Sequence, residues 1–321
     1  MKKLIAWLLL CCLLTASALG EWTLEEEIDL DAPDFPLEDV ATPEPEPTPE
    51  PTDTPEPTDT PEPEPLTYDP GTVRSRYESA TLRFTIRLAK INSCKTFITE
   101  LWMAEPGRQI VKETAQWREH LANTEDMAER LPTCRLAISG SGYVSPVYSW
   151  IPEEYPGDNE DYFYTPLGSL TVTHGKVFRN LEGVKYSGLT LEEDGLHVYR
   201  DADNAEVLAR QPKETWSFYE ECPLIMDGED VLDRSWPFAN RKAIRQVIAR
   251  LDDHNYVILT TAGTITVTAC VDFLLEYYQP VMAYNLDGGP SAALLRRVSK
   301  SRYKVIQQNR QKNVDMMGFT D

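Results

Sequence analysis

The chain has 321 residues and a formal net charge of −21, and its acidic residues are unevenly distributed. Seventeen Asp and Glu and no Lys or Arg fall between residues 21 and 65, whereas residues 66–321 carry 35 acidic and 29 basic side chains. A nucleic-acid backbone needs a basic face, so this charge argues against nucleic acid as a partner.

The first 20 residues have the order of a secretory signal peptide. Lys2 and Lys3 precede an apolar run from Leu4 to Leu14, and small residues follow up to Gly20. The run is shorter than the ~20 residues of a membrane-spanning helix. We therefore expect a secreted or cell-surface, extracytoplasmic protein, which contacts a membrane only if the signal stays uncleaved as an anchor.

Residues 21–66 form an acidic, proline-rich linker, with ten prolines between Pro43 and Pro65. Proline fixes φ and lacks an amide donor, so we expect this segment to be disordered and extended. Residues 67–321 are then expected to form one domain with enough residues for a substantial core.

Within this domain the hydrophobic pattern predicts interspersed strands and helices. Alternating apolar residues in Thr81–Leu88 indicate a half-buried strand. Further strands are predicted at residues 95–101, 134–138, 169–173, 196–199, 256–260 and 281–286, and helices at 114–131 and 267–278. Because the two types do not alternate regularly, we predict an α+β fold with a mixed β-sheet core and flanking helices.

Four cysteines follow the signal segment, namely Cys94, Cys134, Cys222 and Cys270. They contain no C-x-x-C pair, so a zinc ribbon is not expected. Two alternatives remain: one or two disulfides formed in an oxidising compartment, or buried thiols that act as small apolar side chains.

The string YNLDGGPS at Tyr284–Ser291 follows an apolar strand. Asn285 and Asp287 alternate, so both side chains point to the same side, and Gly288 and Gly289 let backbone amides approach a bound anion. The alternative is a tight turn in which Asp287 caps the amides that follow it.

Three more strings accompany it: LAISGSGY at 136–143, WSFY at 216–219 with Asp227-Gly228, and RKAI at 241–244. In this order the four strings resemble the phosphodiester glycosidase family, over about residues 81–319. The family's Asn-Leu-Asp-Gly-Gly-x-Ser signature is matched at residues 285–289 and 291.

The resemblance implies an exported hydrolase that cleaves sugar-1-phosphodiester linkages in envelope or exopolysaccharide glycans. Asp287 would be the essential carboxylate, Arg241 the bidentate phosphate contact, and Asn285 the group that orients the substrate. The residues expected to bind the substrate are Ser139, Gly140, Ser141, Gly288, Gly289, Ser291 and Trp216. The expected ligand is a sugar-phosphate or polysaccharide, with no metal and no cofactor.

The chain also departs from the family pattern. Ser139 replaces an Asn, Arg245 replaces a Gly, and residues 261–263 read Thr-Ala-Gly instead of Asp-Gly-Arg. Glycoside cleavage usually uses two carboxylates, and only Asp287 is evident. The alternative function is therefore a catalytically degenerate member that binds a glycan or cell-wall polymer.

An acidic, aromatic stretch offers a possible sugar-stacking rim, formed by Trp150, Tyr155, Tyr162 and Tyr164. The alternative interpretation is a set of solvated turns.

Overall fold

The computed structural model describes residues 66–146, 155–219, 221–299, 302–307 and 311–321. The predicted signal segment and nearly all of the linker lie outside these ranges. All elements below belong to the compact unit Glu62–Asp321. Within the described ranges, no helix combines the length and apolar character needed to cross a bilayer.

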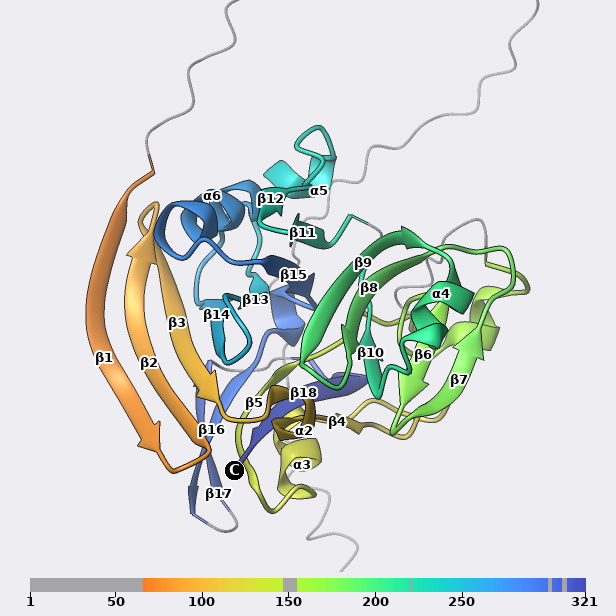
Figure 1. Ribbon diagram of the computed structural model, residues 1–321, viewed down its shortest axis with the longest axis horizontal. Helices are drawn as coiled ribbons and strands as arrows, with labels where there is room; N and C mark the ends of the chain where they lie inside the picture. Colours follow the sequence, from red (N-terminus) through yellow and green to blue (C-terminus); the bar gives the residue numbers. More distant parts are fainter. Residues whose placement is uncertain (1–65, 147–154, 220, 300–301, 308–310) are drawn as a thin grey trace, which may run out of the picture. The chain divides into compact units, whose positions relative to one another are not determined.

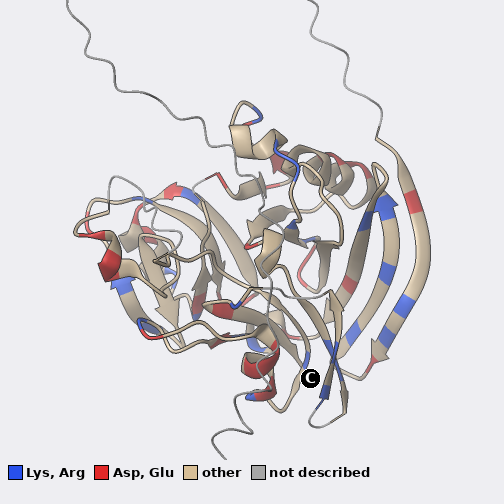
Figure 2. Cartoon of the chain, turned by 180° about the vertical axis from the view of Figure 1, so that it is seen from behind, with Lys and Arg blue, Asp and Glu red and all other residues tan. Residues whose placement is uncertain are grey.

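The largest sheet has eight strands (Figure 1). Their order is β1 (Tyr68–Glu78), β2 (Leu82–Ile91), β3 (Cys94–Met103), β14 (Asn255–Thr261), β13 (Gln246–Arg250), β15 (Met282–Leu286), β11 (Pro223–Met226) and β12 (Glu229–Asp230). The long strands β1 to β3 form successive hairpins, and β3 joins the rest of the sheet through β14. Lys and Arg recur along β1 and β2 (Figure 2).

Three smaller sheets complete the β-structure. The five-stranded sheet has the order β17 (Arg302–Gln307), β16 (Leu294–Ser299), β5 (Cys134–Ser139), β18 (Asp315–Thr320) and β4 (Ile110–Thr114). The others are β10 (Glu214–Trp216), β8 (Tyr186–Leu191) and β9 (Leu196–Ala202), and the hairpin of β6 (Leu170–Thr173) and β7 (Lys176–Asn180). All pairings between these named strands are antiparallel, and one isolated bridge, between Val144 and Phe163, is parallel.

The helices are short, apart from α6 (Val267–Tyr277), where the Thr266 hydroxyl caps the first turn by accepting from the Ala269 amide. The others are α2 (Pro106–Gln109), α3 (Thr124–Glu129), α4 (Asn204–Ala209) and α5 (Pro237–Asn240), with 3₁₀ turns η1 (Asn159–Tyr162) and η2 (Gly289–Ser291). Strands dominate and helices flank them, which confirms the α+β prediction.

Most predicted elements are confirmed within a few residues, but the helix predicted over 114–131 is wrong. The chain instead leaves β4 at Thr114 and makes a turn at residues 117–119, and the segments on both sides of this turn bond to the C-terminal segment. The Ala115 amide donates to the Val314 carbonyl at 2.8 Å, and Ala122 bridges Asn313. Only Thr124–Glu129 is helical, because pairing with a distant strand outweighs the local helix propensity.

The core lies on both faces of the large sheet. In β14, Tyr256 and Ile258 belong to the cluster that includes residues of β5 and β18, whereas Val257 and Leu259 belong to the cluster that includes α6. This strand is therefore apolar on both faces, which explains its continuous run of hydrophobic residues. The two layers hold the ends of β13, β14 and β15 in place.

All four cysteines are free and buried. Burial raises the pKa of Cys222 and of Cys270 to about 12, so these thiols are neutral. The structure thus agrees with the second alternative drawn from the sequence, that of small buried apolar side chains.

Candidate functional site

The loop that follows β15 of the eight-stranded sheet is hydrogen-bonded to the end of β5 in the five-stranded sheet. The Asp287 amide donates to the Gly140 carbonyl at 3.0 Å, and the Ser139 hydroxyl donates to the Asp287 carbonyl at 2.8 Å. Two strings that lie almost 150 residues apart in the sequence therefore meet at one place.

A cavity of about 330 Å³ opens beside this loop. Six residues singled out in the sequence line it: Arg241, Asn285, Asp287, Gly288, Gly289 and Ser291. They come from the β15 loop and from the segment between α5 and β13. The structure thus places the C-terminal carboxylate and the distant arginine around one cavity.

Asp287 is only 8% exposed, and its ionisation is perturbed. Burial raises its pKa to about 7; a hydrogen bond with Ser291 acts in the opposite direction, and the charge of Asp315 adds to the increase. Near neutral pH both the acid and the carboxylate are populated. A carboxyl with this pKa can exchange a proton with a bound water or ligand.

A buried ion pair lies beneath the loop that follows β15. Lys112 Nζ lies 3.3 Å from Asp315, and both side chains are fully buried. Asp315 also accepts from the Ser141 amide at 2.7 Å and from the Ser141 hydroxyl at 2.9 Å. The Lys112 ammonium lies 5.1 Å from the centre of the Trp216 ring.

Four residues expected to bind the substrate have other positions: Ser139, Gly140, Ser141 and Trp216 are not among the residues that line the cavity. Trp216 is fully buried in the core, and the Ser139 hydroxyl bonds the backbone of Asp287. Their place is beneath the loop, where they set its position.

The predicted anion cradle is smaller than the string suggested. The Gly289 amide donates to the Ile244 carbonyl at 2.9 Å, and the Ser291 amide donates to the Gly288 carbonyl at 3.0 Å. In this loop as described, the Gly288 amide is the one glycine amide without a recorded hydrogen bond. A Cβ on Gly288 would lie 2.5 Å from the Ile244 carbonyl oxygen, so the glycine is needed for close approach to β13.

Asn285 lines the cavity and is almost fully buried. Its Nδ2 donates to the Leu286 carbonyl at 3.1 Å, whereas its Oδ1 has no partner within the described ranges. An unpaired buried carbonyl oxygen is unfavourable, and a ligand hydroxyl would satisfy it.

The sequence did not identify the aromatic wall of the cavity, which is formed by Phe218, Tyr219 and Phe238. The ring centres of Tyr219 and Phe238 are 5.4 Å apart, and those of Phe218 and Phe238 are 6.0 Å apart. Of these, Phe218 and Tyr219 belong to the WSFY string, which was the available signal.

The three described tyrosines of the proposed aromatic rim, Tyr155, Tyr162 and Tyr164, do not line the cavity. Tyr155 and Tyr162 are buried in a cluster against which Phe218 packs, and Trp150 lies outside the described residues.

Two arginines enter the cavity wall. Arg241 is exposed, and Arg245, noted in the sequence only as a departure, is 1% exposed. Neither forms an ion pair with Asp287 or with another described carboxylate. Asp287 is the one carboxylate among the described residues that line this cavity.

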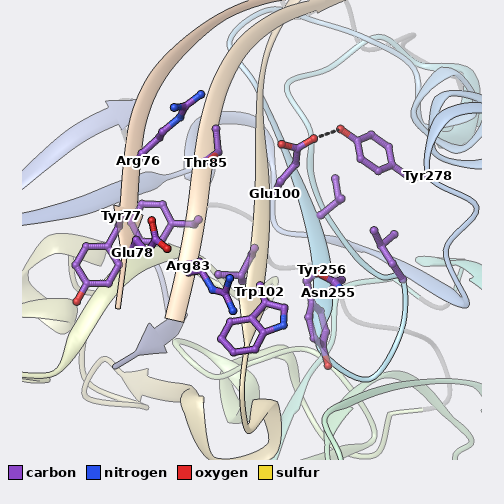
Figure 3. A pocket seen from close by; sticks show the side chains of 14 residues that line it. Arg76, Tyr77, Glu78, Arg83, Thr85, Glu100, Trp102, Asn255, Tyr256 and Tyr278 are labelled. Carbon is purple, nitrogen blue, oxygen red and sulfur yellow. Dashed lines mark hydrogen bonds between the residues drawn. The ribbon is translucent and has the colours of Figure 1, made fainter. Parts of the chain in front are cut away.

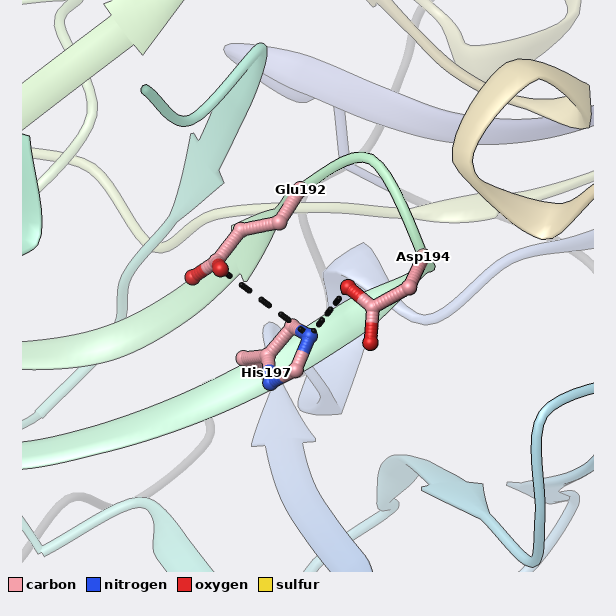
Figure 4. Close-up of side chains that lie close together, drawn as sticks. All are labelled: Glu192, Asp194 and His197. Atoms are coloured by element: carbon pink, nitrogen blue, oxygen red, sulfur yellow. Dashed lines mark hydrogen bonds and ion pairs between the residues drawn. The ribbon is translucent and has the colours of Figure 1, made fainter. Parts of the chain in front are cut away.

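One other group has the residue types of a metal site: Glu192, Asp194 and His197 (Figure 4). The carboxylates already have cationic partners, because Arg210 lies 3.1 Å from Glu192 and Arg250 lies 3.5 Å from Asp194. These interactions account for the cluster without an ion.

A larger cavity of about 610 Å³ lies over β1, β2, β3 and β14 (Figure 3). Several of its polar groups have internal partners: the Arg83 guanidinium stacks 4.0 Å from the centre of the Trp102 ring, and Tyr278 donates to Glu100 at 3.1 Å. It shares no lining residue with the cavity of Asp287, so its size does not make it the reactive site.

Comparisons with known proteins identify the family. Among solved structures, the catalytic domain of zebrafish N-acetylglucosamine-1-phosphodiester alpha-N-acetylglucosaminidase, auto-inhibited by its pro-peptide, is similar, with a TM-score of 0.56 and 14% identity over 80% of this chain and 88% of that chain. A hypothetical protein from Synechocystis has a TM-score of 0.45 and 13% identity over 75% of this chain and 62% of that chain. No curated protein matches.

The zebrafish likeness shows that the fold is shared. The family model for phosphodiester glycosidases matches residues 133–317, more than half of the sequence and all of the segments that form the cavity. The chain therefore belongs to the phosphodiester glycosidase family.

Proposed function

We propose that this chain is an exported hydrolase that cleaves the bond between a sugar's anomeric carbon and a phosphodiester in envelope or exopolysaccharide glycans. The observation that carries the proposal is the cavity lined both by Asp287, with its raised pKa, and by Arg241, with which it forms no ion pair. A sugar-phosphate has the complementary chemistry, since its phosphate suits the guanidinium and its anomeric carbon suits the carboxylate.

In this reaction the ionised Asp287 takes a proton from a water molecule. The water oxygen bonds to the anomeric carbon, and the carbon–oxygen bond to phosphate breaks with its electron pair going to the phosphate. Arg241 stabilises the charge that develops on the phosphate oxygens. Asn285 Oδ1, which has no partner in the described residues, accepts from a sugar hydroxyl.

One carboxylate is sufficient for this bond because the leaving group is a phosphate monoester. Its second pKa is about 6, so it departs as an anion without the proton that an ordinary sugar alcohol needs. The aromatic wall of Tyr219 and Phe238 offers an apolar surface for one face of the sugar ring.

The second candidate function is glycan binding without turnover, and the single carboxylate is the observation in its favour. The test is hydrolysis of a panel of sugar-1-phosphodiesters by the full chain and by Asp287→Ala. Glu206→Ala, an exposed acidic residue of α4, is the matched control. We expect turnover in the native protein and the control, and a loss of about 10³-fold or more in Asp287→Ala.

Equal background rates in all three proteins would contradict the hydrolase. Ligand binding that persists in those proteins would then favour the binding function.

Export is proposed on the strength of residues 1–20 alone. Expression in a bacterial host, cell fractionation and N-terminal sequencing test it. An extracytoplasmic product that begins near Glu21 would support the proposal, and a cytoplasmic product that retains Met1 would contradict it.

A further inference from the structure

Arg245 is a buried cation whose recorded side-chain partners are all neutral. Its Nε donates to the Ile265 carbonyl at 3.3 Å, and its Nη2 donates to the Phe238 carbonyl at 3.0 Å and also to the Arg241 carbonyl. Its Nη1 has no recorded partner in the described parts of the chain, and the residue lines the cavity. Burial lowers the pKa of this guanidinium, as expected for a charge removed from water.

Three other cations are buried in the described residues, namely Lys112, Arg250 and Arg297. Lys112 pairs with Asp315 at 3.3 Å, and Arg250 pairs with Asp253 at 2.9 Å. Arg297 is enclosed by the carbonyls of several residues and by the Tyr303 hydroxyl. Lys112 and Arg250 also line cavities, but each has a carboxylate partner, whereas Arg245 lines its cavity without one.

Arg241 adds a second positive charge to the wall of the same cavity. The two arginines repel each other electrostatically, and no described carboxylate separates them. Two like charges at the wall of one cavity are unfavourable unless an anion lies between them. The Phe238 ring packs 4.1 Å from the Arg245 guanidinium and holds its plane, which favours bidentate contact with a phosphate.

We propose that Arg245 and Arg241 together form a dianion site, and that the cavity therefore binds a phosphate monoester more tightly than a phosphodiester. The inference rests on the proposed function and extends it: the monoester is the product that hydrolysis leaves, so the protein is inhibited by its own product. Asp287 lines the same cavity and forms no ion pair with either arginine.

The test uses inorganic phosphate as the probe, at pH 8 where it is a dianion, and dimethyl phosphate as the monoanionic diester. Isothermal titration of the full chain should show binding of phosphate and weaker binding of dimethyl phosphate. In Arg245→Gln the affinity for phosphate should fall about 10- to 100-fold, as expected when one charge-assisted contact is lost.

Arg297→Gln is the matched control, since it removes a buried arginine that does not line this cavity. It should bind phosphate like the native protein. Equal phosphate affinity in Arg245→Gln and Arg297→Gln would overturn the proposal, as would failure of the native protein to bind phosphate.

The Arg245 side chain also donates to three carbonyls, so the folding of Arg245→Gln has to be checked. If that variant does not fold, a crystal structure of the native protein with phosphate decides. A phosphate oxygen within hydrogen-bond distance of Arg245 Nη1 supports the site, and a phosphate bound only elsewhere overturns it.

The outcome is separable from that of the hydrolase proposal. Phosphate binding requires no turnover, and Asp287→Ala should retain it. A protein that binds phosphate through Arg245 but shows no Asp287-dependent hydrolysis would support the dianion site and contradict the hydrolase.

Discussion

Replacing Asp287 with Asn should stabilise the protein in a pH-dependent manner. Burial raises the pKa of this carboxyl from 3.8 to about 7, so the folded protein disfavours the ionised form. A difference of about 3 pH units corresponds to about 4 kcal/mol of unfolding free energy. The neutral amide of Asn has nearly the same shape and carries no such penalty.

The sign follows from which state holds the proton. Below pH 3.8 the carboxyl is protonated in both states, and the penalty is absent. Between pH 4 and pH 7 the folded state keeps a proton that the unfolded state has lost, so native stability falls as pH rises. Above about pH 7 the full penalty applies. The gain in Asp287→Asn should therefore grow from near zero at pH 4 to about 4 kcal/mol at pH 8.

Urea denaturation of both full-length proteins at pH 4, 6 and 8 measures this difference, because it compares unfolding free energies under matched conditions. A difference that does not change with pH would refute the reasoning. So would destabilisation of the variant at pH 8, which would mean that one of the nearby arginines stabilises the carboxylate.

Two further variants test the support of the site. Asp315→Asn leaves the Lys112 charge buried without its partner, and it should lower the unfolding free energy by about 3–5 kcal/mol in urea denaturation; a loss below 1 kcal/mol would contradict this role. Gly288→Ala places a Cβ 2.5 Å from the Ile244 carbonyl and should cost about 1–3 kcal/mol, whereas Gly263→Ala, whose nearest atom would be 3.3 Å away, should change the melting temperature little. Equal melting temperatures for the two glycine variants would argue against the close approach.

Sequence patterns correctly predicted the strands and helices whose conformation depends mainly on residues close together in the sequence. The alternation in Leu82–Ile91 and the capped run of α6 determine their own conformation, and both were found. Residues 115–122 have helix propensity, but they form a turn whose two ends, Ala115 and Ala122, bond to the C-terminal segment. A local pattern contains no information on a partner that lies so far along the chain.

The same limit applies to the site. Asp287, Gly288 and Gly289 could be recognised in the sequence because a carboxylate followed by two glycines is a distinctive local pattern. Arg245 was visible only as a mismatch, since its burial and its missing counter-charge appear only when β13 and α5 are in place. Likewise, Ser141 and Trp216 read as ligand contacts, but in the structure they lie beneath the loop, where Ser141 bonds Asp315.

Strand β14 pairs along Asn255–Thr261 with β3, which belongs to a part of the chain that precedes the family-matched residues 133–317. Strand β18 likewise depends on β4, from the same preceding part. If the matched residues were expressed alone, β14 and β18 would each lack one neighbouring strand. The unpaired strand edges would then promote aggregation. The smallest segment expected to fold on its own is thus longer than the family-matched residues. For expression or gene fusion, the N-terminal domain boundary should be placed before β1.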